Sequence, residues 1–446
     1  MMQSPGLIIA APGSGSGKTV VTLGLLRALR NRGHDIIGAK AGPDYIDPMF
    51  HAVASGKPAN NLDPWAMRQG TITRLVQADN HGGEILIAEG VMGLFDGANL
   101  PGRPDAGSTA DLAAMTGWPV ILVVDAARQA ASVAALVAGF ANHRTDVHIS
   151  GVILNRVGSA AHTQVLHDAL AATCPDIPVM GTIPRNPELA LPERHLGLVP
   201  AYEHAQLETF IKTAARVMSD VIDLDMLVSV ARPCKLLPKE PDLPAQLNPF
   251  GQRIAIAHDE AFAFTYPSVL AGWQQAGAEL AFFSPLADEL PTHEVDAVYL
   301  PGGYPELHAA QLADAKNFKA GLRAAASRGA QIFGECGGYM VLGRGLEDAD
   351  GNRHEMTGLL PVETSFARRK LHLGYRKVTT TTASPLGVQA SVFRGHEFHY
   401  ASIVSEDNTA PLFAATNTRG DDLGTVGTAI GSVAGSFIHL IDQDTA

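Results

Sequence analysis

The sequence predicts a two-domain α/β protein whose first domain carries a phosphate-binding loop (P-loop) on a parallel sheet. Three observations lead to this prediction. Short apolar, β-branched runs alternate with longer amphipathic stretches, which is the pattern of a parallel sheet with helices on both faces. A glycine-rich loop ending in Gly17-Lys-Thr19 follows the first apolar run. Five prolines between residues 231 and 249 interrupt the alternation, which then starts again.

Length and composition exclude several classes of protein. The chain has 446 residues, of which 46% are apolar and 17% charged, so it can bury at least one large core and is too apolar for disorder. A formal charge of −12 disfavours general binding of nucleic acid. Cys174, Cys234 and Cys336 are too few and too scattered for a disulfide framework or a zinc site. Because neither a signal peptide nor a membrane span is apparent, we expect a cytoplasmic protein without a membrane or nucleic-acid partner.

Six strands and one clear helix are predicted in the first half. The helix follows the glycine-rich loop over residues 18–31, with Leu23, Leu26 and Leu29 at helical spacing. Continuous hydrophobicity in residues 119–124 predicts a strand buried on both faces. The predicted strands are Leu7–Ala11, Asp35–Lys40, Ile85–Glu89, Val120–Asp125, His148–Leu154 and Val179–Ile183.

The proline-rich stretch is interpreted as a linker, because so many prolines cannot continue a helix or a central strand. We therefore predict a first domain over residues 1–232, a linker over 233–249 and a second domain over 250–446. The second domain repeats the alternating pattern, with predicted strands at Arg253–Ala257, Glu279–Ser284, Ala297–Leu300 and Gln331–Gly334.

The loop after the first strand is predicted to bind phosphate. Its glycines allow backbone N–H groups to converge on phosphate oxygens, Lys18 supplies a positive charge, and the Thr19 hydroxyl suits Mg²⁺. The strict pattern places glycine at position 12, where this chain has Pro12. The order of strand, loop and helix still favours a P-loop over a merely structural turn.

Acidic residues follow two of the predicted strands. Asp44 and Asp47 come just after the second strand, and Glu89 ends the third, with Asp96 shortly beyond it. Ligands of open α/β sheets bind at the carboxyl ends of strands, where such acids could hold Mg²⁺ or contact substrate. The sequence Gly42-Pro-Asp44 is also ordinary turn chemistry, so the structural interpretation stays open.

A cysteine in the second half lies in a pattern that predicts a nucleophile. Cys336 is at the centre of Gly334-Glu-Cys-Gly-Gly338, between a predicted strand and a helix, where a sharp turn would expose the thiol. We expect the N-terminus of the helix to favour the thiolate. Gly302 and Gly303 end another predicted strand, and their N–H groups could form an oxyanion hole.

The thiol needs a base, and three histidines are candidates for it. Chain order and strand-end placement favour His439 over His396 and His399. The segment that holds the latter two is either a polar strand edge or a segment that contacts substrate.

Five motifs resemble one family, in the family's order and across nearly the whole chain. The chain is similar to the a,c-diamide synthases of cobalamin biosynthesis, which act on cobyrinic acid or, in the aerobic pathway, on hydrogenobyrinic acid. The motifs are residues 10–19 (AAPGSGSGKT), 42–48 (GPDYIDP), 89–97 (EGVMGLFDG), 334–340 (GECGGYM) and 395–400 (GHEFHY).

This resemblance implies a dethiobiotin-synthetase-like ATP domain fused to a class I glutamine amidotransferase domain. The family amidates the a and c acetate side chains of a corrin with ATP and L-glutamine. Cys336 would be the glutaminase nucleophile and His439 its base. Class I amidotransferases usually carry an acid two residues after this histidine, where the present chain has Ile441. A Cys–His dyad is therefore implied, and the orientation of the imidazole is left open.

The resemblance also implies roles at the nucleotide site. A corrin acetate oxygen would attack the γ-phosphate of ATP to give an acyl phosphate, while Lys18, Lys40 and Mg²⁺ offset the charge. The implied metal ligands are Thr19, Asp44 and Glu89. Asn155 resembles the asparagine that reads adenine in the dethiobiotin synthetase fold. The implied ATP-binding residues are Gly15, Ser16, Gly17, Lys18, Thr19, Lys40 and Asn155, and the implied substrate contacts are Tyr45, Asp47, Asp96, His396 and His399.

Three alternatives are weighed against this interpretation. The related cobyric acid synthases pair similar domains, but their loop and nucleophile motifs differ. A partitioning or switch ATPase would leave the second domain and its thiol turn unexplained. A degenerate amidotransferase that only binds is disfavoured by the intact glycines around Cys336. Whether the macrocycle holds cobalt, whether ammonia follows a protected path between domains and whether an edge strand supports a homodimer are left open.

Overall fold

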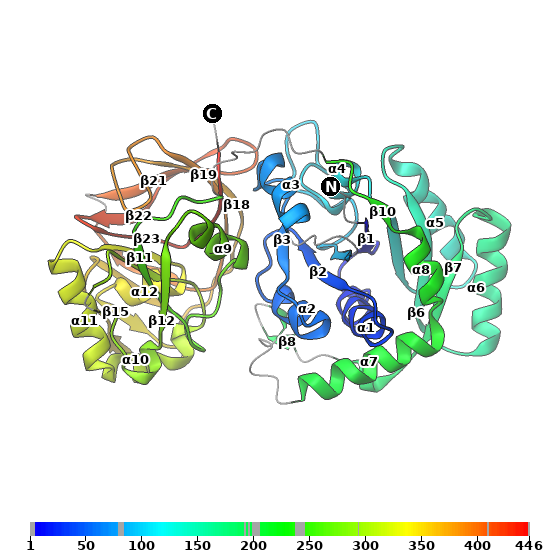
Figure 1. The fold of residues 1–446 in the computed structure, drawn as a ribbon, viewed down its shortest axis with the longest axis horizontal. Coiled ribbons are helices and arrows are strands. Elements are labelled where there is room, and N and C mark those ends of the chain that lie inside the picture. The colour runs from blue at the N-terminus through cyan, green and yellow to red at the C-terminus, as the bar shows by residue number, and fades with distance from the viewer. Residues whose placement is uncertain are drawn as a thin grey trace. The chain divides into compact units, whose positions relative to one another are not determined.

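The computed structural model describes residues 5–78, 84–190, 193–194, 197–198, 206–236, 246–292, 294–407 and 410–444. Contacts divide the chain into two compact units, shown in Figure 1. The first comprises residues 1–65 and 69–241, and the second comprises residues 66–68 and 242–446. The middle of the predicted linker, residues 237–245, lies outside the described residues.

The first unit is built on a parallel sheet with the strand order β3-β2-β4-β1-β5-β6-β7. Its central strands are buried along nearly their whole length, as expected where helices cover both faces. Helix α1 packs against α2 and α7, and Figure 1 shows α1 and α7 together in blue and green beside the sheet. The strands are β1 Pro5–Ala10, β2 Ile36–Ala41, β3 Asn60–Leu62, β4 Ile85–Glu89, β5 Val120–Asp125, β6 Ile149–Val157 and β7 Val179–Pro184.

Helices and short pairings complete this unit. Strand β10 pairs antiparallel with β1 through Arg232 and Pro233, so the sheet reaches the first residue of the predicted linker. A separate pair is formed by β8 Glu193–Arg194 and β9 Gly197–Leu198. The α-helices are α1 Lys18–Asn31, α2 Asp47–Ser55, α3 Gln69–Ala78, α4 Thr109–Thr116, α5 Ser132–His143, α6 Ala160–Thr173, α7 Leu207–Val221 and α8 Leu224–Val230, and η1 Pro187–Leu189 is a 3₁₀ turn.

The second unit is built on a mixed sheet with the order β12-β11-β13-β14-β23-β22-β21-β18-β19-β24. In this spatial order, the first five strands (β12, β11, β13, β14 and β23) run parallel to one another. The remaining five (β22, β21, β18, β19 and β24) extend the sheet from β23 in antiparallel pairs. The sheet's strands are β11 Arg253–Ala257, β12 Glu279–Phe283, β13 Ala297–Leu300, β14 Gln331–Glu335, β18 His372–Thr380, β19 Val392–His399, β21 Pro411–Thr416, β22 Asp422–Ile430, β23 Val433–Ser436 and β24 Ile438–Gln443.

A second, four-stranded sheet and short helices pack around this one. The smaller sheet has the order β16-β15-β17-β20. Its strands are β15 Gly345–Glu347, β16 Arg353–Glu355, β17 Val362–Ser365 and β20 Ser402–Glu406. The helices are α9 Pro267–Gln275, α10 Ala309–Asp314, α11 Lys316–Ser327 and α12 Gly337–Leu342, with 3₁₀ turns η3 Pro285–Ala287 and η4 Pro305–His308.

The predicted α/β class is confirmed in both units. Helix α1 and strands β4, β5, β11 and β13 have the predicted bounds, and the other predicted strands shift at one or both ends. The largest shift is in β6, which runs three residues past Leu154 and therefore includes Asn155. Within the described residues, no helix is long and apolar enough to cross a membrane.

Candidate active sites

The P-loop connects β1 to α1 at the carboxyl edge of the first sheet. Gly15 and Gly17 have positive φ angles of 76° and 89°, which glycine adopts without a steric penalty. A Cβ at Gly17 would also lie 2.3 Å from the side-chain nitrogen of Asn155. The Ser16 hydroxyl donates back to the carbonyl of Gly13 at 2.8 Å, which closes the loop on itself.

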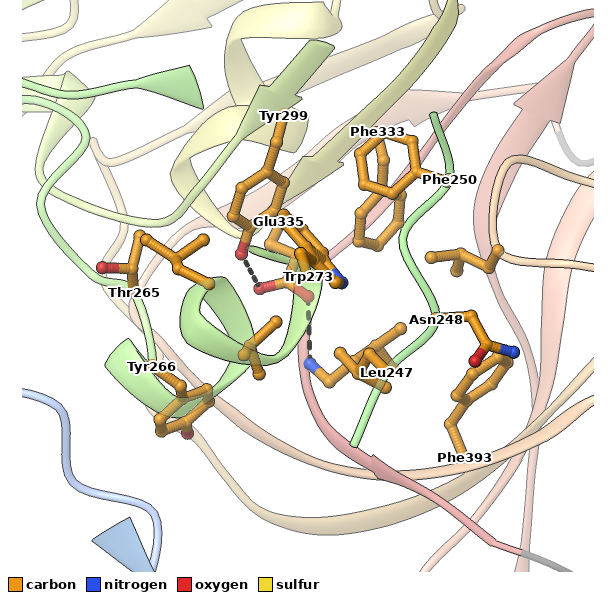
Figure 2. A pocket seen from close by; sticks show the side chains of 14 residues that line it. Leu247, Asn248, Phe250, Thr265, Tyr266, Trp273, Tyr299, Phe333, Glu335 and Phe393 are labelled. Carbon is orange, nitrogen blue, oxygen red and sulfur yellow. Dashed lines mark hydrogen bonds between the residues drawn. The ribbon is translucent and has the colours of Figure 1, made fainter. Parts of the chain in front are cut away.

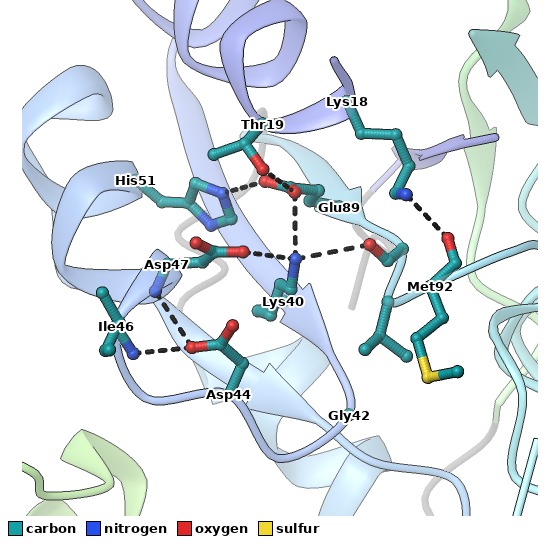
Figure 3. A network of polar contacts seen from close by, with 12 residues as sticks. Lys18, Thr19, Lys40, Gly42, Asp44, Ile46, Asp47, His51, Glu89 and Met92 are labelled. Carbon is teal, nitrogen blue, oxygen red and sulfur yellow. Dashed lines mark hydrogen bonds and ion pairs between the residues drawn. The ribbon is translucent and has the colours of Figure 1, made fainter. Parts of the chain in front are cut away.

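Lys18 and Thr19 extend from the start of α1 toward the segment that begins with β4 (Figure 3). The Lys18 ammonium donates to the carbonyl oxygen of Met92 at 2.6 Å, and the Thr19 hydroxyl donates to Glu89 Oε1 at 2.6 Å. Burial and the nearby Lys40 charge lower the pKa of Lys18. The loop and the end of β4 therefore form one site.

Glu89 is the centre of a buried network, drawn in Figure 3. Its Oε1 accepts from Lys40 Nζ at 2.9 Å, and its Oε2 lies 2.7 Å from His51 Nε2. Lys40 Nζ also pairs with Asp47 Oδ2 at 2.5 Å. His51 was missed by the sequence analysis, although it follows Asp47 by one helical turn on α2 and so faces the same edge of the sheet.

Burial and charge set the protonation states in this network. Burial acts to raise the pKa of Glu89, but Lys40 and the hydrogen-bonded His51 outweigh it and hold this pKa well below its usual range. Burial acts to lower the pKa of Lys40, yet the Asp47 and Glu89 carboxylates raise it. Burial and the Asp44 carboxylate raise the pKa of Asp47. Both shifts favour the ion pair of an ionised Glu89 with a protonated Lys40.

The remaining acids of this site have structural partners. Asp44 Oδ1 accepts from the backbone N–H groups of Ile46 and Asp47 at 2.8 and 3.2 Å, so it fixes the start of α2. Asp96 Oδ2 accepts from the N–H of Gly93 at 2.7 Å. Tyr45 is buried, with 4% of its surface exposed. The predicted substrate contacts of Tyr45, Asp47 and Asp96 stay predictions.

The hydroxyl and carboxylate oxygens at this edge of the sheet are the kind of ligand that fits Mg²⁺, which prefers hard oxygen ligands. The Thr19 hydroxyl and the Glu89 carboxylate already meet at 2.6 Å. Within the described residues, Asp44, Asp47 and Glu89 do not form a compact group with all ligand atoms in mutual reach. Thr19 and Glu89 are therefore the best-placed pair, and the part of Asp44 in metal binding stays a prediction.

Asn155 lies under the P-loop. Its amide nitrogen donates to the carbonyl of Ser16 at 2.9 Å, and its amide oxygen accepts from the N–H of Arg156 at 2.9 Å. Both ends of the amide are thus engaged with backbone, and Asn155 supports the loop. Contact with adenine would require one of these bonds to be exchanged and stays a prediction.

In the second unit, Cys336 forms the sharp turn between β14 and α12. Its backbone has φ 48° and ψ −101°, a strained conformation for a residue with a side chain. Glycine is required two residues later, because a Cβ at Gly338 would lie 1.9 Å from the carbonyl oxygen of Leu300. The Cys336 N–H donates to the carbonyl of Ser436 at 2.8 Å, which ties the turn to β23.

The protonation of Cys336 differs from the sequence-based expectation. The thiol is 4% exposed, and burial together with the Glu306 carboxylate raises its pKa well above the usual range. The predicted effect of the helix N-terminus is therefore outweighed by burial, since α12 has only six residues. A base beside the thiol is needed to form the nucleophile.

The Gly302–Gly303 loop adjoins both the thiol turn and His439. A Cβ at Gly302 would lie 2.4 Å from His439 Cε1 and 3.3 Å from its Nε2. The N–H nitrogen of Gly303 lies 3.0 Å from the Cβ position of Gly337, the residue after Cys336. This placement supports an oxyanion hole at the loop, with the imidazole of His439 against it.

We expect Gly302→Ala to impair glutamine hydrolysis, because the new methyl group would displace the His439 ring. A displacement of about 1 Å at a reacting group lowers the rate by roughly 10²-fold. Glutaminase assays test this, with Gly272→Ala as the matched control, since its Cβ would meet nothing within 4 Å. Normal hydrolysis by the Gly302 variant would place the base elsewhere.

The other two candidate bases are engaged differently. His396 pairs with His439 across β19 and β24 and packs edge-on to Tyr375 at 5.5 Å between ring centroids. His399 lies between two acceptors, the carbonyl of Ala401 at 3.0 Å and Glu397 Oε1 at 2.9 Å. The geometry therefore favours His439 as the base, as the sequence did.

Burial and the nearby His439 lower the pKa of His396 to about 3. Its unfolded pKa is about 6.5, so between pH 6.5 and 3 the unfolded chain binds a proton that the folded chain does not. We therefore expect stability to fall as pH is lowered through this window, and His396→Gln to reduce that slope. Urea unfolding at a series of pH values measures it, with the exposed His258→Gln as control. An unchanged slope would contradict the prediction.

A cavity of about 300 Å³ lies beside β18 and β19. His399 lines it with Arg376 and Glu397, and both Arg376 Nε and His399 Nε2 contact the Glu397 carboxylate. His372, Glu397 and His399 bring their ligand atoms within 4.8 Å of one another. The two imidazoles are stacked at an interplanar angle of 3°, however, and parallel offset rings cannot both direct a nitrogen at one ion. His399 thus lines a polar cavity, and His396 is buried and is not among the lining residues.

The two sites define a nucleotide-binding domain joined in one chain to a glutamine amidotransferase domain. Residues 7–199 match the family described as the CobQ/CobB/MinD/ParA nucleotide binding domain. Residues 253–446 match the CobB/CobQ-like glutamine amidotransferase domain.

Full-length relatives narrow this class. The chain is 55% identical to the hydrogenobyrinate a,c-diamide synthase of Brucella suis biovar 1 (strain 1330), over 98% of each chain. It is 56% identical to the enzyme of that name from Rhizobium meliloti (strain 1021), over 98% of this chain and 99% of the relative. The chain belongs to the hydrogenobyrinate a,c-diamide synthase family. The resemblance seen in the motifs is thereby confirmed, and the partitioning ATPase alternative is excluded because the match spans both domains.

Proposed function

We propose that this chain uses ATP, Mg²⁺ and L-glutamine to amidate the a and c acetate carboxylates of hydrogenobyrinate. Residues 1–232 would bind ATP and the corrin, and residues 250–446 would release ammonia from glutamine. The names of the full-length relatives support hydrogenobyrinate over the cobalt-loaded cobyrinate.

One observation carries the proposal: a P-loop that shares a buried network with Glu89 and a strained cysteine turn occur in the same chain. A carboxylate is a poor acceptor for ammonia and must first be activated. A nucleotide site activates it as an acyl phosphate, and a glutaminase supplies the nitrogen. Amidation needs both sites, because the nucleotide site alone supplies no nitrogen and the glutaminase site alone does not activate the carboxylate.

At the nucleotide site, the residues of this chain would position the phosphates of ATP and neutralise their charge. Lys18, released from the Met92 carbonyl, would contact the phosphates, and Lys40 stays charged between Asp47 and Glu89. Thr19 and Glu89 would hold Mg²⁺, which when bound offsets phosphate charge. An acetate oxygen of the substrate attacks the γ-phosphorus, the bond to ADP breaks, and the acyl phosphate forms.

At the thiol site, His439 takes the proton of Cys336, whose sulfur attacks the carboxamide carbon of glutamine. N–H groups of Gly302 and Gly303 would bind the oxyanion. The imidazolium returns the proton to the leaving ammonia, and water then hydrolyses the glutamyl thioester. Ammonia attacks the acyl phosphate, which releases phosphate and leaves the amide.

The experiment that tests the proposal is mass spectrometry of hydrogenobyrinic acid after incubation with enzyme, ATP and glutamine, with cobyrinic acid alongside. We expect hydrogenobyrinic acid to show the mass change of two OH→NH₂ replacements. Preference for cobyrinic acid would correct the macrocycle and retain the chemistry. Glutamine hydrolysis without a change in either corrin would contradict the proposed substrate.

A further inference from the structure

The base of the thiol site lacks the acid that amidotransferases of this class carry two residues later, since that position is the fully buried Ile441. An imidazole that takes and returns a proton at one nitrogen needs its other nitrogen held by an acceptor. A different carboxylate lies beside His439, and it comes from the residue immediately before the nucleophile.

That residue is Glu335, the last residue of β14, which is 3% exposed. Its Oε2 lies 3.7 Å from His439 Nδ1, at ion-pair distance and beyond hydrogen-bond length. The Cε1 and Nε2 atoms of the ring face Gly302 and the loop that adjoins Cys336. The carboxylate thus lies nearest Nδ1, while Nε2 is the ring nitrogen nearest this loop.

Two donors hold the Glu335 carboxylate in place, as Figure 2 shows. The Tyr299 hydroxyl donates to Oε2 at 2.8 Å, and the N–H of Leu440 donates to Oε1 at 3.1 Å. Burial and the Glu335 charge raise the pKa of Tyr299 well above its usual range, so the hydroxyl remains a donor. Because Leu440 follows His439, the same carboxylate also fixes the backbone that carries the base.

The cavity beside Glu335 is lined mainly by apolar and aromatic side chains. The small cavity in Figure 2 is lined by Phe250, Trp273 and Phe333, among other apolar side chains. In such surroundings a carboxylate interacts strongly with a nearby cation. Glu335 lies at ion-pair distance from His439 Nδ1, and His396, which its low pKa keeps neutral, pairs with His439 across β19 and β24. An imidazolium formed when Cys336 loses its proton would therefore meet the Glu335 charge.

We propose that Glu335 is the positioning residue of His439: it holds the proton on Nδ1, leaves Nε2 to take the thiol proton, and stabilises the imidazolium. This inference rests on the proposed roles of Cys336 and His439. The structure thus supplies a third member to the implied dyad, from the strand of the nucleophile instead of the strand of the base.

The test compares Glu335→Gln, which keeps the shape and removes the charge, with Tyr299→Phe, which removes one hydrogen bond and keeps the charge. The first readout is alkylation of the Cys336 peptide by iodoacetamide as a function of pH. Without the charge, the thiolate–imidazolium pair is less stable, so we expect the midpoint for Glu335→Gln to rise by about one pH unit or more. The midpoint for Tyr299→Phe is expected to shift by much less, because the charge remains and the N–H of Leu440 still holds the carboxylate.

The second readout is glutamine hydrolysis. We expect Glu335→Gln to lower kcat by up to roughly 10⁴-fold, the loss measured when the orienting acid of a serine-protease triad is neutralised, and Glu335→Asp to recover part of it. Equal loss in Glu335→Gln and Tyr299→Phe with unchanged alkylation midpoints would show a purely structural role and overturn the inference. The variant His439→Ala distinguishes failure of the proposed base from failure of the Glu335 inference. If His439→Ala retains glutamine hydrolysis, His439 is not the base. If His439→Ala is inactive and Glu335→Gln is as active as the unchanged enzyme, only the inference about Glu335 is wrong.

Discussion

Cys336→Ala is expected to abolish amidation with glutamine and to retain amidation with ammonia at high concentration. Removing the nucleophile of a triad lowers kcat by about 10⁶-fold in the measured case of a serine protease, so glutamine-dependent turnover should fall below detection. The nucleotide site belongs to the other unit, and none of its contacts includes the thiol. Substrate activation should therefore proceed when ammonia is supplied.

The measurement is the rate of amide formation with each nitrogen source, by mass spectrometry of the corrin. Cys174→Ala is the matched control, because Cys174 is also a buried cysteine and its sulfur lies 3.8 Å from the carbonyl oxygen of Ala134, outside both sites. We expect Cys174→Ala to keep amidation with glutamine and amidation with ammonia. If Cys336→Ala lost ammonia-dependent amidation as well, the assignment of nitrogen release and carboxylate activation to separate sites would be wrong.

The sequence was most informative where local chemistry decides the structure. A loop of the type in residues 12–19 needs glycine at particular backbone angles, and Gly15 and Gly17 have them. Apolar β-branched runs buried on both faces give the parallel strands within a few residues. The flanking glycines of Cys336 predicted its strained turn for the same reason, since Gly338 leaves no space for a Cβ beside the Leu300 carbonyl.

The contacts that could not be predicted are those between residues distant in sequence. His51 lies outside the five motifs, and Glu335 was recognised only as part of the motif around Cys336. The contacts of both residues form only when strands and helices pack. Glu335 reaches His439, 104 residues later, because β14 and β23 are neighbours and β24 follows directly. The antiparallel strands from β18 to β24 were not predicted either. Several are partly exposed, so their apolar pattern is weak.

Asn155 and Cys336 show a second limit, which concerns electrostatics. The resemblance implied an amide that reads adenine, which stays a prediction, and in the structure this amide hydrogen-bonds to the P-loop backbone. The helix after Cys336 predicted a favoured thiolate, whereas burial raises the pKa of the thiol. In both cases the residue was found by its motif, but its state depends on the three-dimensional surroundings.

Glu89→Gln is expected to remove amidation with either nitrogen source, by roughly 10²–10³-fold, the range for loss of one preorganised electrostatic partner at a reacting centre. The carboxylate accepts from Thr19 and Lys40 and pairs with His51. A neutral amide has one acceptor oxygen, and its NH₂ would face donors. Lys40 would then be a buried cation paired mainly with Asp47, and the best-placed Mg²⁺ ligand would be gone.

Because neutralising one member of a buried pair also destabilises the fold, the experiment needs controls for stability. Glutamine hydrolysis is the internal control, since the thiol site lies in the other unit and should be unaffected. Glu84→Gln is the matched variant: Glu84 is buried at the start of the same strand region and pairs with Lys57, away from the P-loop. We expect it to lower the unfolding temperature and to keep amidation. Amidation by Glu89→Gln at a rate near that of Glu84→Gln would show that Glu89 serves the fold and not the chemistry.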